Sequence, residues 1–452
     1  MRAALGGLFI IGVLLAATCA GVLAKANKEE QPVAWIREFG TPGLDAARAI
    51  AVEDEKVYAA GLVSGALPGQ DSPGGSDVFL QRYHASGKEV WTRQFGTTGD
   101  DAATVVGSLD VEDGAIYVGG LVSAALPGQG YAGDWDAFLR RYDSAGRELW
   151  TREFGTSGPD VVQGVSVSRG SIYIGGFTSG VLQGQLSAGG IDAFLRKYDA
   201  NGNELWTRQF GTPGSDVAWS VAAGPGGVYV VGGTDGALSG GVNAGSTDAF
   251  IRKYDEAGNE VWTDQFGTSG SDALHGVAVR GGNVYAAGEV QGALPGEIAA
   301  GGFDAFLRMY DEGGGAVWTR QFGTTGRDTV WGVEAHRTGV FVVGFVGGAL
   351  PGQSFAGLVD AFVRDYDASG DLRFTFQFGT PGPDIANDIA FEDPEKGVYV
   401  AGAAAGPLFG QWHSGDRDAF VLKIVPEENA DQGDRTEETA SRCEWGRVLP
   451  RR

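Results

Sequence analysis

Acidic residues recur at one fixed place along the chain, and their spacing could support metal binding. The segment Gly-Thr-x-Gly-x-Asp occurs seven times. Carboxylate oxygens are the ligands that calcium prefers, so these aspartates, grouped around one axis, would suit a calcium site or a water-filled ring. The alternative is structural, because an Asp after a Gly-containing turn commonly accepts backbone N–H hydrogen bonds. The seven candidates are Asp45, Asp101, Asp160, Asp216, Asp272, Asp328 and Asp384.

A second acidic residue begins the motif Asp-x-Phe, which also occurs seven times, from Asp77 to Asp418. We interpret these aspartates as structural in the same way. In five copies an arginine follows four residues later, and its guanidinium could pair with an acidic neighbour or stack on an aromatic face. These arginines are Arg140, Arg196, Arg252, Arg308 and Arg364.

Residues that would identify an enzyme are scarce. The four histidines stand at different places in the repeat, without metal-ligand spacing. No Gly-x-Ser-x-Gly elbow, phosphate loop or dinucleotide fingerprint occurs in the sequence. Carboxylates are abundant, so a glycosidase-type pair stays open. Near-identical repeats favour a scaffold instead, and the local departures from them are His275, Glu289, Glu297, Trp331, Glu334 and His336.

The elements that carry these residues follow a repeat of nearly fixed length. Phe-Gly-Thr occurs seven times, in steps of 56, 59, 56, 56, 56 and 56 residues. Each unit holds four short segments with strand patterning, and in the fourth copy Phe250, Arg252 and Tyr254 alternate with the residues of the opposite face. Helical periodicity of useful length is absent from the repeats.

Four antiparallel strands repeated seven times are typical of a seven-bladed β-propeller, an all-β fold. Neighbouring blades bury each other's faces, and closure of the ring protects the sheet edges. The repeats begin with the strand-like segment 35–39 and end with the segment 418–424. We therefore expect the N-terminal strand to close the ring as the outer strand of the last blade.

In a blade of consecutive antiparallel strands, alternate connections fall on the same face, which groups the Gly-Thr links with the long loops of the pattern Leu-Pro-Gly-Gln. Length varies only in the turn between the first two strands, on the other face, where the second copy has three extra residues and the seventh has two. Functional sites favour loops on rigid scaffolds, so we predict binding on the long-loop face. The alternative is that Leu and Pro cover the core between blades. The candidates are Leu67, Gln70, Leu126, Gln129, Leu294, Glu297, Leu350 and Gln353.

The motif Gly-Gly-x-Asp-Ala-Phe-Leu-x-Lys-Tyr-Asp-x-x-Gly-x-x-x-Trp-Thr-x-Gln-Phe-Gly-Thr resembles the bacterial SBBP-type β-propeller repeat. The resemblance covers about 33–425 and is best in the copies at 190–212 and 245–268. Its Asp-x-x-x-Gly-x-x-x-Trp element is similar to the tryptophan-docking turn of quinoprotein-like propellers, which implies an innermost Gly-Thr-x-Gly-x-Asp strand and an outermost Trp strand. Departures are Phe374 for Trp, Asp264 for Arg and Leu422 for Arg; we interpret them as weakening single blades. The family is known mainly as exported or surface-associated repeats without an assigned activity.

Charge and the termini restrict the partners and the location. The formal net charge of −23 repels phosphate backbones and anionic membrane surfaces, so nucleic-acid binding is not expected. A basic start and an apolar run predict a signal peptide at 1–24, followed by a linker at 25–32. The propeller then occupies 33–425, and a polar, disordered tail occupies 426–452. Cys19 lies in the predicted signal, where residues 16–18 are a poor match to a lipidation signal, and Cys443 lies in the tail.

These observations predict an exported, non-enzymatic propeller, secreted, periplasmic or on the cell surface, that acts as a binding or structural module. Its partner would be a protein or a glycan. We expect no cofactor, no membrane span after cleavage, and a monomer. Two alternatives stay open: a polysaccharide hydrolase or lyase that uses acidic residues of the long-loop face, and a calcium-stabilised scaffold.

Overall fold

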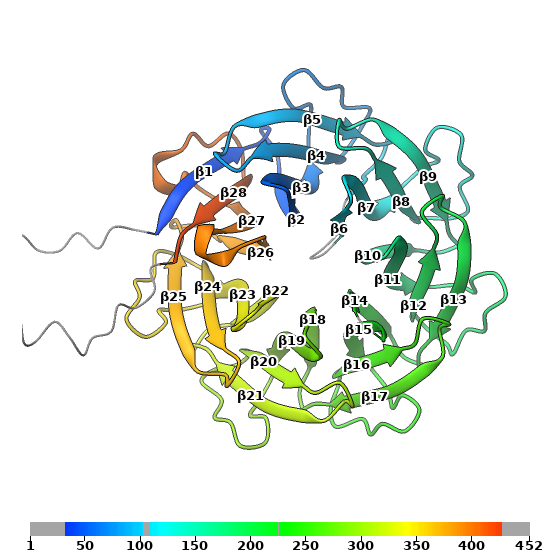
Figure 1. Ribbon diagram of the computed structural model, residues 1–452, viewed down its shortest axis with the longest axis vertical. Helices are drawn as coiled ribbons and strands as arrows, with labels where there is room; N and C mark the ends of the chain where they lie inside the picture. Colours follow the sequence, from blue (N-terminus) through cyan, green and yellow to red (C-terminus); the bar gives the residue numbers. More distant parts are fainter. Residues whose placement is uncertain (1–31, 103–107, 225, 427–452) are drawn as a thin grey trace, which may run out of the picture.

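The computed structural model describes residues 32–102, 108–224 and 226–426, which form a ring of seven four-stranded antiparallel blades around a central channel (Figure 1). The predicted seven-bladed β-propeller is confirmed. The predicted signal peptide lies outside the described residues, as do both cysteines and all but one residue each of the predicted linker and tail. Within those three ranges, no helix is long and apolar enough to cross a membrane.

In each of the first six blades, the four strands follow one another outwards from the channel in chain order. Blade 1 holds β2 (Ala46–Glu53), β3 (Lys56–Val63), β4 (Asp77–His84) and β5 (Glu89–Phe95); blade 2 holds β6 (Leu109–Glu112), β7 (Ala115–Val122), β8 (Asp136–Tyr142) and β9 (Glu148–Phe154); blade 3 holds β10 (Asp160–Ser168), β11 (Ser171–Thr178), β12 (Asp192–Tyr198) and β13 (Glu204–Phe210). Blade 4 holds β14 (Asp216–Gly224), β15 (Gly227–Thr234), β16 (Asp248–Tyr254) and β17 (Glu260–Phe266); blade 5 holds β18 (Asp272–Arg280), β19 (Asn283–Val290), β20 (Asp304–Tyr310) and β21 (Ala316–Phe322); blade 6 holds β22 (Thr329–His336), β23 (Gly339–Val346), β24 (Asp360–Asp367) and β25 (Leu372–Phe378).

Blade 7 is built from both ends of the chain, as predicted. Its strand order is β1 (Val33–Phe39), β28 (Asp418–Ile424), β27 (Val398–Ala404) and β26 (Ile385–Ala390), with short 3₁₀ turns η1 (Pro394–Lys396) and η2 (Leu408–Gly410). Strand β1 runs antiparallel to β28, with Phe39 opposite Ala419. The N–H of Val425 donates to the carbonyl of Pro32 at 2.8 Å, so the two ends of the propeller meet there.

The hydrophobic core lies between blades. Between blades 3 and 4, for example, Tyr173 and Leu195 pack with Val221 and Phe250, and all four side chains are buried. The Phe of each Asp-x-Phe motif is fully buried in the same way. Since both faces of every blade are apolar, each blade is covered only when it has a neighbour on both sides.

The outer tryptophan of one blade docks on the turn between the last two strands of the next. Trp318 of blade 5 donates its indole N–H to the carbonyl of Ala368 in blade 6 at 3.0 Å. Its ring packs against Gly370, whose φ of +81° favours glycine and where a Cβ would lie 3.0 Å from the indole. Arg320 donates to the carbonyl of Gly370 at 2.8 Å. Equivalent indole bonds join the other blades through Trp35, Trp91, Trp150, Trp206 and Trp262.

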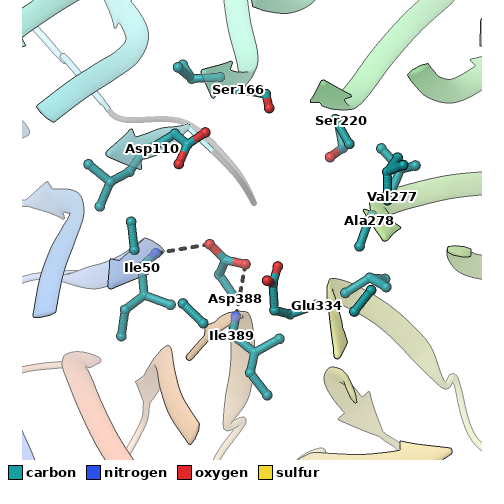
Figure 2. A pocket seen from close by; sticks show the side chains of 18 of the residues that line it. Ile50, Asp110, Ser166, Ser220, Val277, Ala278, Glu334, Asp388 and Ile389 are labelled. Carbon is teal, nitrogen blue, oxygen red and sulfur yellow. Dashed lines mark hydrogen bonds between the residues drawn. The ribbon is translucent and has the colours of Figure 1, made fainter. Parts of the chain in front are cut away.

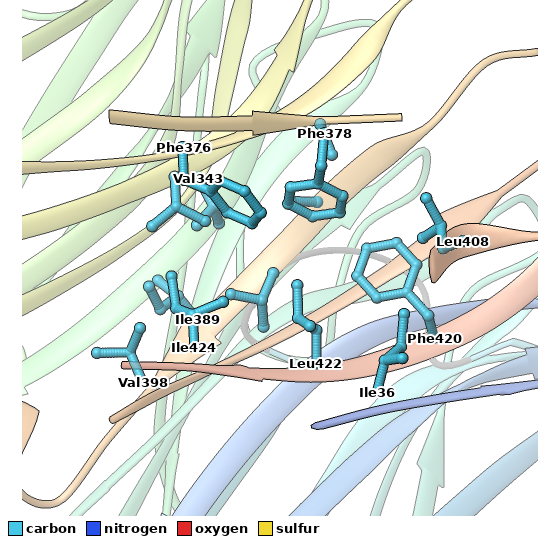
Figure 3. Packing of buried hydrophobic residues seen from close by; sticks show 14 of the residues in the cluster. Ile36, Val343, Phe376, Phe378, Ile389, Val398, Leu408, Phe420, Leu422 and Ile424 are labelled. Carbon is cyan, nitrogen blue, oxygen red and sulfur yellow. The ribbon is translucent and has the colours of Figure 1, made fainter. Parts of the chain in front are cut away.

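The junction between blades 6 and 7 lacks this contact for a reason of topology. Blade 7 has no turn between its last two strands, because those strands come from opposite ends of the chain. Phe374 and Phe376 replace the Trp and the Arg there, and Leu422 replaces the Arg of the third strand. Phe376 and Leu422 lie in one apolar cluster (Figure 3) and Phe374 packs against it, so these departures fit a single junction.

The arginines after Asp-x-Phe all stack on aromatic rings, and an acidic side chain also lies near four of them, Arg140, Arg196, Arg252 and Arg308. The guanidinium carbon of Arg196 lies 3.8 Å from the ring centre of Phe154 in the preceding blade, and its Nη1 lies 3.5 Å from Glu204 Oε2. Stacking on a phenylalanine recurs for Arg140, Arg252, Arg308 and Arg364.

Our prediction of where repeat length varies is wrong for blade 2. Its first hairpin turn holds only Asp113 and Gly114 between the paired residues Glu112 and Ala115, as short as the corresponding turn of blade 1. The three extra residues fall between Ala102, which is bridged to Leu121, and the remainder of the inner strand. In blade 7 the two extra residues do lie in the turn, where η1 forms.

The tryptophan-docking contact predicts that substitutions at equivalent outer-strand positions of blades 5 and 6 change the free energy of unfolding differently. Trp318→Phe removes the indole N–H, and we expect the free energy of unfolding to fall by about 0.5–1.5 kcal/mol, the net contribution of one hydrogen bond. Phe374→Trp should bring no gain, because blade 7 offers no turn carbonyl to accept the bond. Urea unfolding of both variants measures this. A stabilised Phe374→Trp variant would contradict the topological explanation.

Candidate functional site

The seven candidate metal-binding aspartates are buried structural residues. Each is at most 1% exposed and accepts a hydrogen bond from the backbone N–H of the Thr in Phe-Gly-Thr. Burial raises the pKa of Asp216, while the hydroxyl of Thr234 and the N–H of Thr212 oppose that rise. The structural alternative therefore holds for Asp45, Asp101, Asp160, Asp216, Asp272, Asp328 and Asp384, which do not line the channel cavity.

These aspartates stand in pairs with those of Asp-x-Phe, at the junction of two blades. The glycine of Phe-Gly-Thr passes between the two carboxylates. A Cβ at Gly211 would lie 2.6 Å from both Asp192 Oδ1 and Asp216 Oδ2, so any other residue would collide with them. Glycine thus recurs at this position because a larger residue would not fit between the two buried carboxyl groups.

The long-loop candidates are not free to bind. Leu67, Leu126, Leu294 and Leu350 are 1–3% exposed and belong to the cores between blades, so their prediction as binding residues is wrong. The polar candidates are half-buried, and each accepts the N–H of an outer-strand residue through a side-chain oxygen. This holds for Gln70, Gln129, Glu297 and Gln353, which fix the loop.

The exposed positions of the long loops lie one residue further along. The residue directly after the loop Gln of blade 3, Leu186, is 86% exposed, and Val242, which follows Gly241 at the same position of blade 4, is 75% exposed. Ile298 in blade 5 is 86% exposed, and Trp412 in blade 7 is 73% exposed. No sequence signal separates these exposed residues from Leu67 and its equivalents, which lie in the same Gly-rich loops and are buried.

A cavity of about 300 Å³ lies in the central channel. Carboxylates from three inner strands point towards it: Asp110 on β6, Glu334 on β22 and Asp388 on β26 (Figure 2). Asp110 accepts the N–H of Val167 in the next blade at 2.7 Å, and Asp388 accepts that of Ile50 at 3.0 Å.

Two of these channel carboxylates, Asp110 and Glu334, ionise with difficulty. Burial raises the pKa of Asp110 to about 7. Burial also raises the pKa of Glu334 to about 8, and the charges of Asp388 and Asp110 add to the effect. Two acids that hold protons near neutral pH are compatible with acid catalysis and equally with a strained polar wall.

An aromatic cluster lies at the end of the channel nearer the long loops. The rings of His275 and Trp331 are 4.3 Å apart between centres, and Trp219 lies 5.6 Å from His275. Trp219 and Trp331 belong to blades 4 and 6, so their contact at 6.4 Å has to be made in front of blade 5, on the channel side. His275 is 4% exposed, and neither ring nitrogen has a hydrogen-bond partner.

A buried glutamate beside this cluster is paired with an arginine. Glu289 occupies a position on β19 that is apolar or Gly in the other blades, and it accepts two bonds from the Arg327 guanidinium, at 2.6 and 2.9 Å. Thr329 adds a hydroxyl bond at 2.5 Å, and the nearest nitrogen of His275 is 3.9 Å away. Burial opposes ionisation of Glu289, but His275, Arg327 and Thr329 outweigh it and lower its pKa to about 2.

The six residues that depart from the repeat pattern therefore lie in different parts of the structure. His275, Glu289 and Trp331 come together at the channel mouth. Glu334 lies deeper in the channel, and Glu297 fixes a loop. His336 lies at the opposite end of the inner strands, bonded to Asp365 at 2.8 Å, beside an open hollow of about 810 Å³ between blades 6 and 7.

The mouth suits binding more than catalysis. Two half-buried indoles offer faces for an apolar group or a sugar ring, and Arg327 is half-exposed beside them. Glu289 is held by Arg327 and Thr329 and is not placed to act as a base. Trp219 and Arg327 were not identified from the sequence, because a single Trp or Arg in a variable position has no spacing to mark it.

Comparison with known proteins adds the following. No protein-family model matches the chain, so the SBBP resemblance stays a prediction. The regulatory protein FlaEY of Caulobacter vibrioides is 28% identical over an alignment of 422 residues, and the match covers 82% of this chain. The chain spans 42% of the length of that protein.

Two solved WD40 propellers are also similar, both at low sequence identity. The WD40 domain of Neurospora crassa Pan2 matches with a TM-score of 0.46 at 11% identity, covering 85% of this chain and 90% of that domain. The WD40 β-propeller domain of Doa1 matches with a TM-score of 0.45 at 11% identity, covering 86% and 97%. Neither likeness bears on function.

The channel carboxylates predict a loss of stability at alkaline pH. The pKa of Glu334 is about 8 in the folded protein, above that of an unfolded glutamate, so its contribution is fully present below the unfolded pKa and is lost as pH rises to about 8. We expect the melting temperature to fall between pH 5 and pH 8. Glu334→Gln should fall less, while Glu256→Gln on an exposed turn should follow the parent protein. Equal slopes for both variants would contradict the assignment.

Proposed function

We propose that this chain is an exported, non-enzymatic β-propeller that binds a protein partner through its long-loop face. The observation that carries the proposal is the row of exposed aliphatic side chains on three consecutive blades. Leu186, Val242 and Ile298 occupy equivalent loop positions and are at least 75% exposed. Covering such groups removes the cost of their hydration, which is why apolar residues arranged along one face are typical of interaction surfaces.

The channel mouth on the same face supports this proposal. Inner strands begin at the long-loop face, and Trp219, His275 and Trp331 lie near that end. A partner side chain that entered the mouth would meet two indole faces and an imidazole without a hydrogen-bond partner. An unsatisfied buried donor costs about 1–3 kcal/mol, so a polar atom of the partner would gain that energy by pairing with His275.

Export is proposed from the sequence pattern of residues 1–24 and fits the resemblance to SBBP-type repeats. The Caulobacter relative is named a regulatory protein, and regulation exerted by binding would be compatible with a propeller that has no catalytic constellation of its own among the described residues. The acidic surface would favour a partner with a basic contact area.

A second candidate is the hydrolase or lyase acting on polysaccharide. Asp110 and Glu334 favour it, because two protonated carboxylates in one cavity could supply a general acid. Turnover of envelope polysaccharides, lost in Glu334→Gln, would support that candidate over binding.

The proposed interface predicts that three substitutions abolish binding without changing the fold. We expect Leu186→Ser, Val242→Ser and Ile298→Ser, combined, to weaken the complex by at least tenfold, because each buried aliphatic side chain contributes about 1.5–3 kcal/mol. Partners are captured from the envelope fraction on the parent protein, purified, and measured again with each variant by calorimetry.

The matched control uses the same three blades. Leu205, Val261 and Val317 on the outer strands are 54–55% exposed, and their serine variants alter a different surface by a similar amount. Retained affinity in this control, with unchanged melting in both triple variants, is expected. Binding that survives the loop triple but disappears with Trp219→Ala would replace the protein interface by a ligand, such as a glycan, held in the channel mouth.

A further inference from the structure

In most blades, the residue at one position of the repeat donates a hydrogen bond to a buried aspartate. The residue before Phe-Gly-Thr is Gln in five blades. In blade 3, Gln209 donates its amide to Asp192 Oδ2 at 2.7 Å and to the carbonyl of Gly180 at 2.8 Å, while its oxygen accepts the N–H of Leu182. The buried carboxylate of Asp-x-Phe thus faces a neutral donor.

Two blades carry Glu at this position, so that two carboxylates face each other. In blade 2, Glu153 stands opposite Asp136, and one oxygen of each has no hydrogen-bond partner. Burial raises the pKa of Glu153 to about 7, and the charge of Asp136 contributes. The residue five positions before Asp136 is Tyr131, which brings no cation.

In the closing blade two carboxylates also face each other, and there a histidine lies beside them. Glu38 comes from β1 and Asp418 from β28, and His413 stands five positions before Asp418. His413 Nδ1 lies 2.8 Å from Glu38 Oε1 and 3.4 Å from Asp418 Oδ2. The side chains of both acids are fully buried, whereas His413 keeps 15% exposure.

The three side chains are held in place by further bonds. Glu38 Oε2 accepts the N–H of Leu408 at 2.9 Å, and Asp418 Oδ1 accepts the hydroxyl of Ser414 at 3.1 Å. One donor atom of each of Glu38, His413 and Asp418 lies within 4.8 Å of the other two. Bonds of this kind orient the ligands of metal sites.

We infer that Glu38, His413 and Asp418 bind a divalent transition-metal ion, with zinc as the best fit, which joins the two ends of the chain. Zinc binds imidazole nitrogen and carboxylate oxygen, so one imidazole and two carboxylates can supply three of its four ligands, and water can take the fourth position. Two buried carboxylates supply the negative charge that a divalent cation balances. Calcium does not fit, because it prefers six to eight oxygen ligands.

The test measures melting of the untagged full chain with zinc chloride and then with EDTA. We expect the melting temperature of the parent protein to rise by several degrees with zinc and to return with EDTA, since an ion that binds only the folded ring stabilises it. Glu38→Gln restores the amide found in five other blades, so it should fold normally and lose the zinc response. Calorimetry should give one zinc equivalent for the parent protein and none for this variant.

A gain-of-site variant provides the matched control. Tyr131→His places an imidazole beside Glu153 and Asp136, at the position that His413 occupies in the closing blade, and should raise the stoichiometry to two equivalents. Absence of a zinc response in the parent protein overturns the inference and leaves a hydrogen-bonded His–carboxylate cluster. An undiminished response in Glu38→Gln also overturns it, because the zinc would then be bound elsewhere.

Discussion

Every blade of this propeller is apolar on both faces, and the rest of the structure depends on that constraint. Phe250 and Ile251 are neighbours on β16 and point to opposite faces, yet both are fully buried. A single blade cannot cover two such faces, so only a closed ring satisfies all seven. Closure in turn requires β1 to complete the last blade, and it leaves that blade without the turn that docks a tryptophan elsewhere. Phe374 and Phe376 follow directly from this loss.

Much of the fold could be predicted from the sequence because the same residue types recur at the same spacing in seven repeats. A single Trp or Gly-Thr pair would carry little information, but their fixed spacing predicted the seven blades and the closing strand, while the resemblance to quinoprotein-like propellers implied the order of strands within a blade. Burial could not be predicted in the same way. Leu67 and its equivalents share a Gly-rich loop with exposed residues, and only the packing of the next blade decides that Leu67 is inside while Leu186 is outside.

The buried carboxylates show why repetition obscures the site. Asp216 and Asp192 look functional by count and spacing, but their hydrogen bonds explain them completely as parts of a blade junction. The residues at the channel mouth are single occurrences, and their spacing says nothing. His275, Glu289 and Arg327 become recognisable as a group only when three strands bring them together.

Departures from the repeat are informative only after the demands of ring closure have been removed. Phe374, Phe376 and Leu422 fill a junction that lacks a turn, so they need no functional explanation. At the channel mouth, by contrast, no feature of topology distinguishes blade 5 from blade 3 or 4. There, across the boundary to blade 6, Arg327 balances the charge of Glu289 and Thr329 donates a hydrogen bond to it. Without Arg327 and Thr329 the buried Glu289 carboxylate would lack its closest hydrogen-bond donors. The mouth therefore departs from the repeat through matched contacts that ring closure does not require.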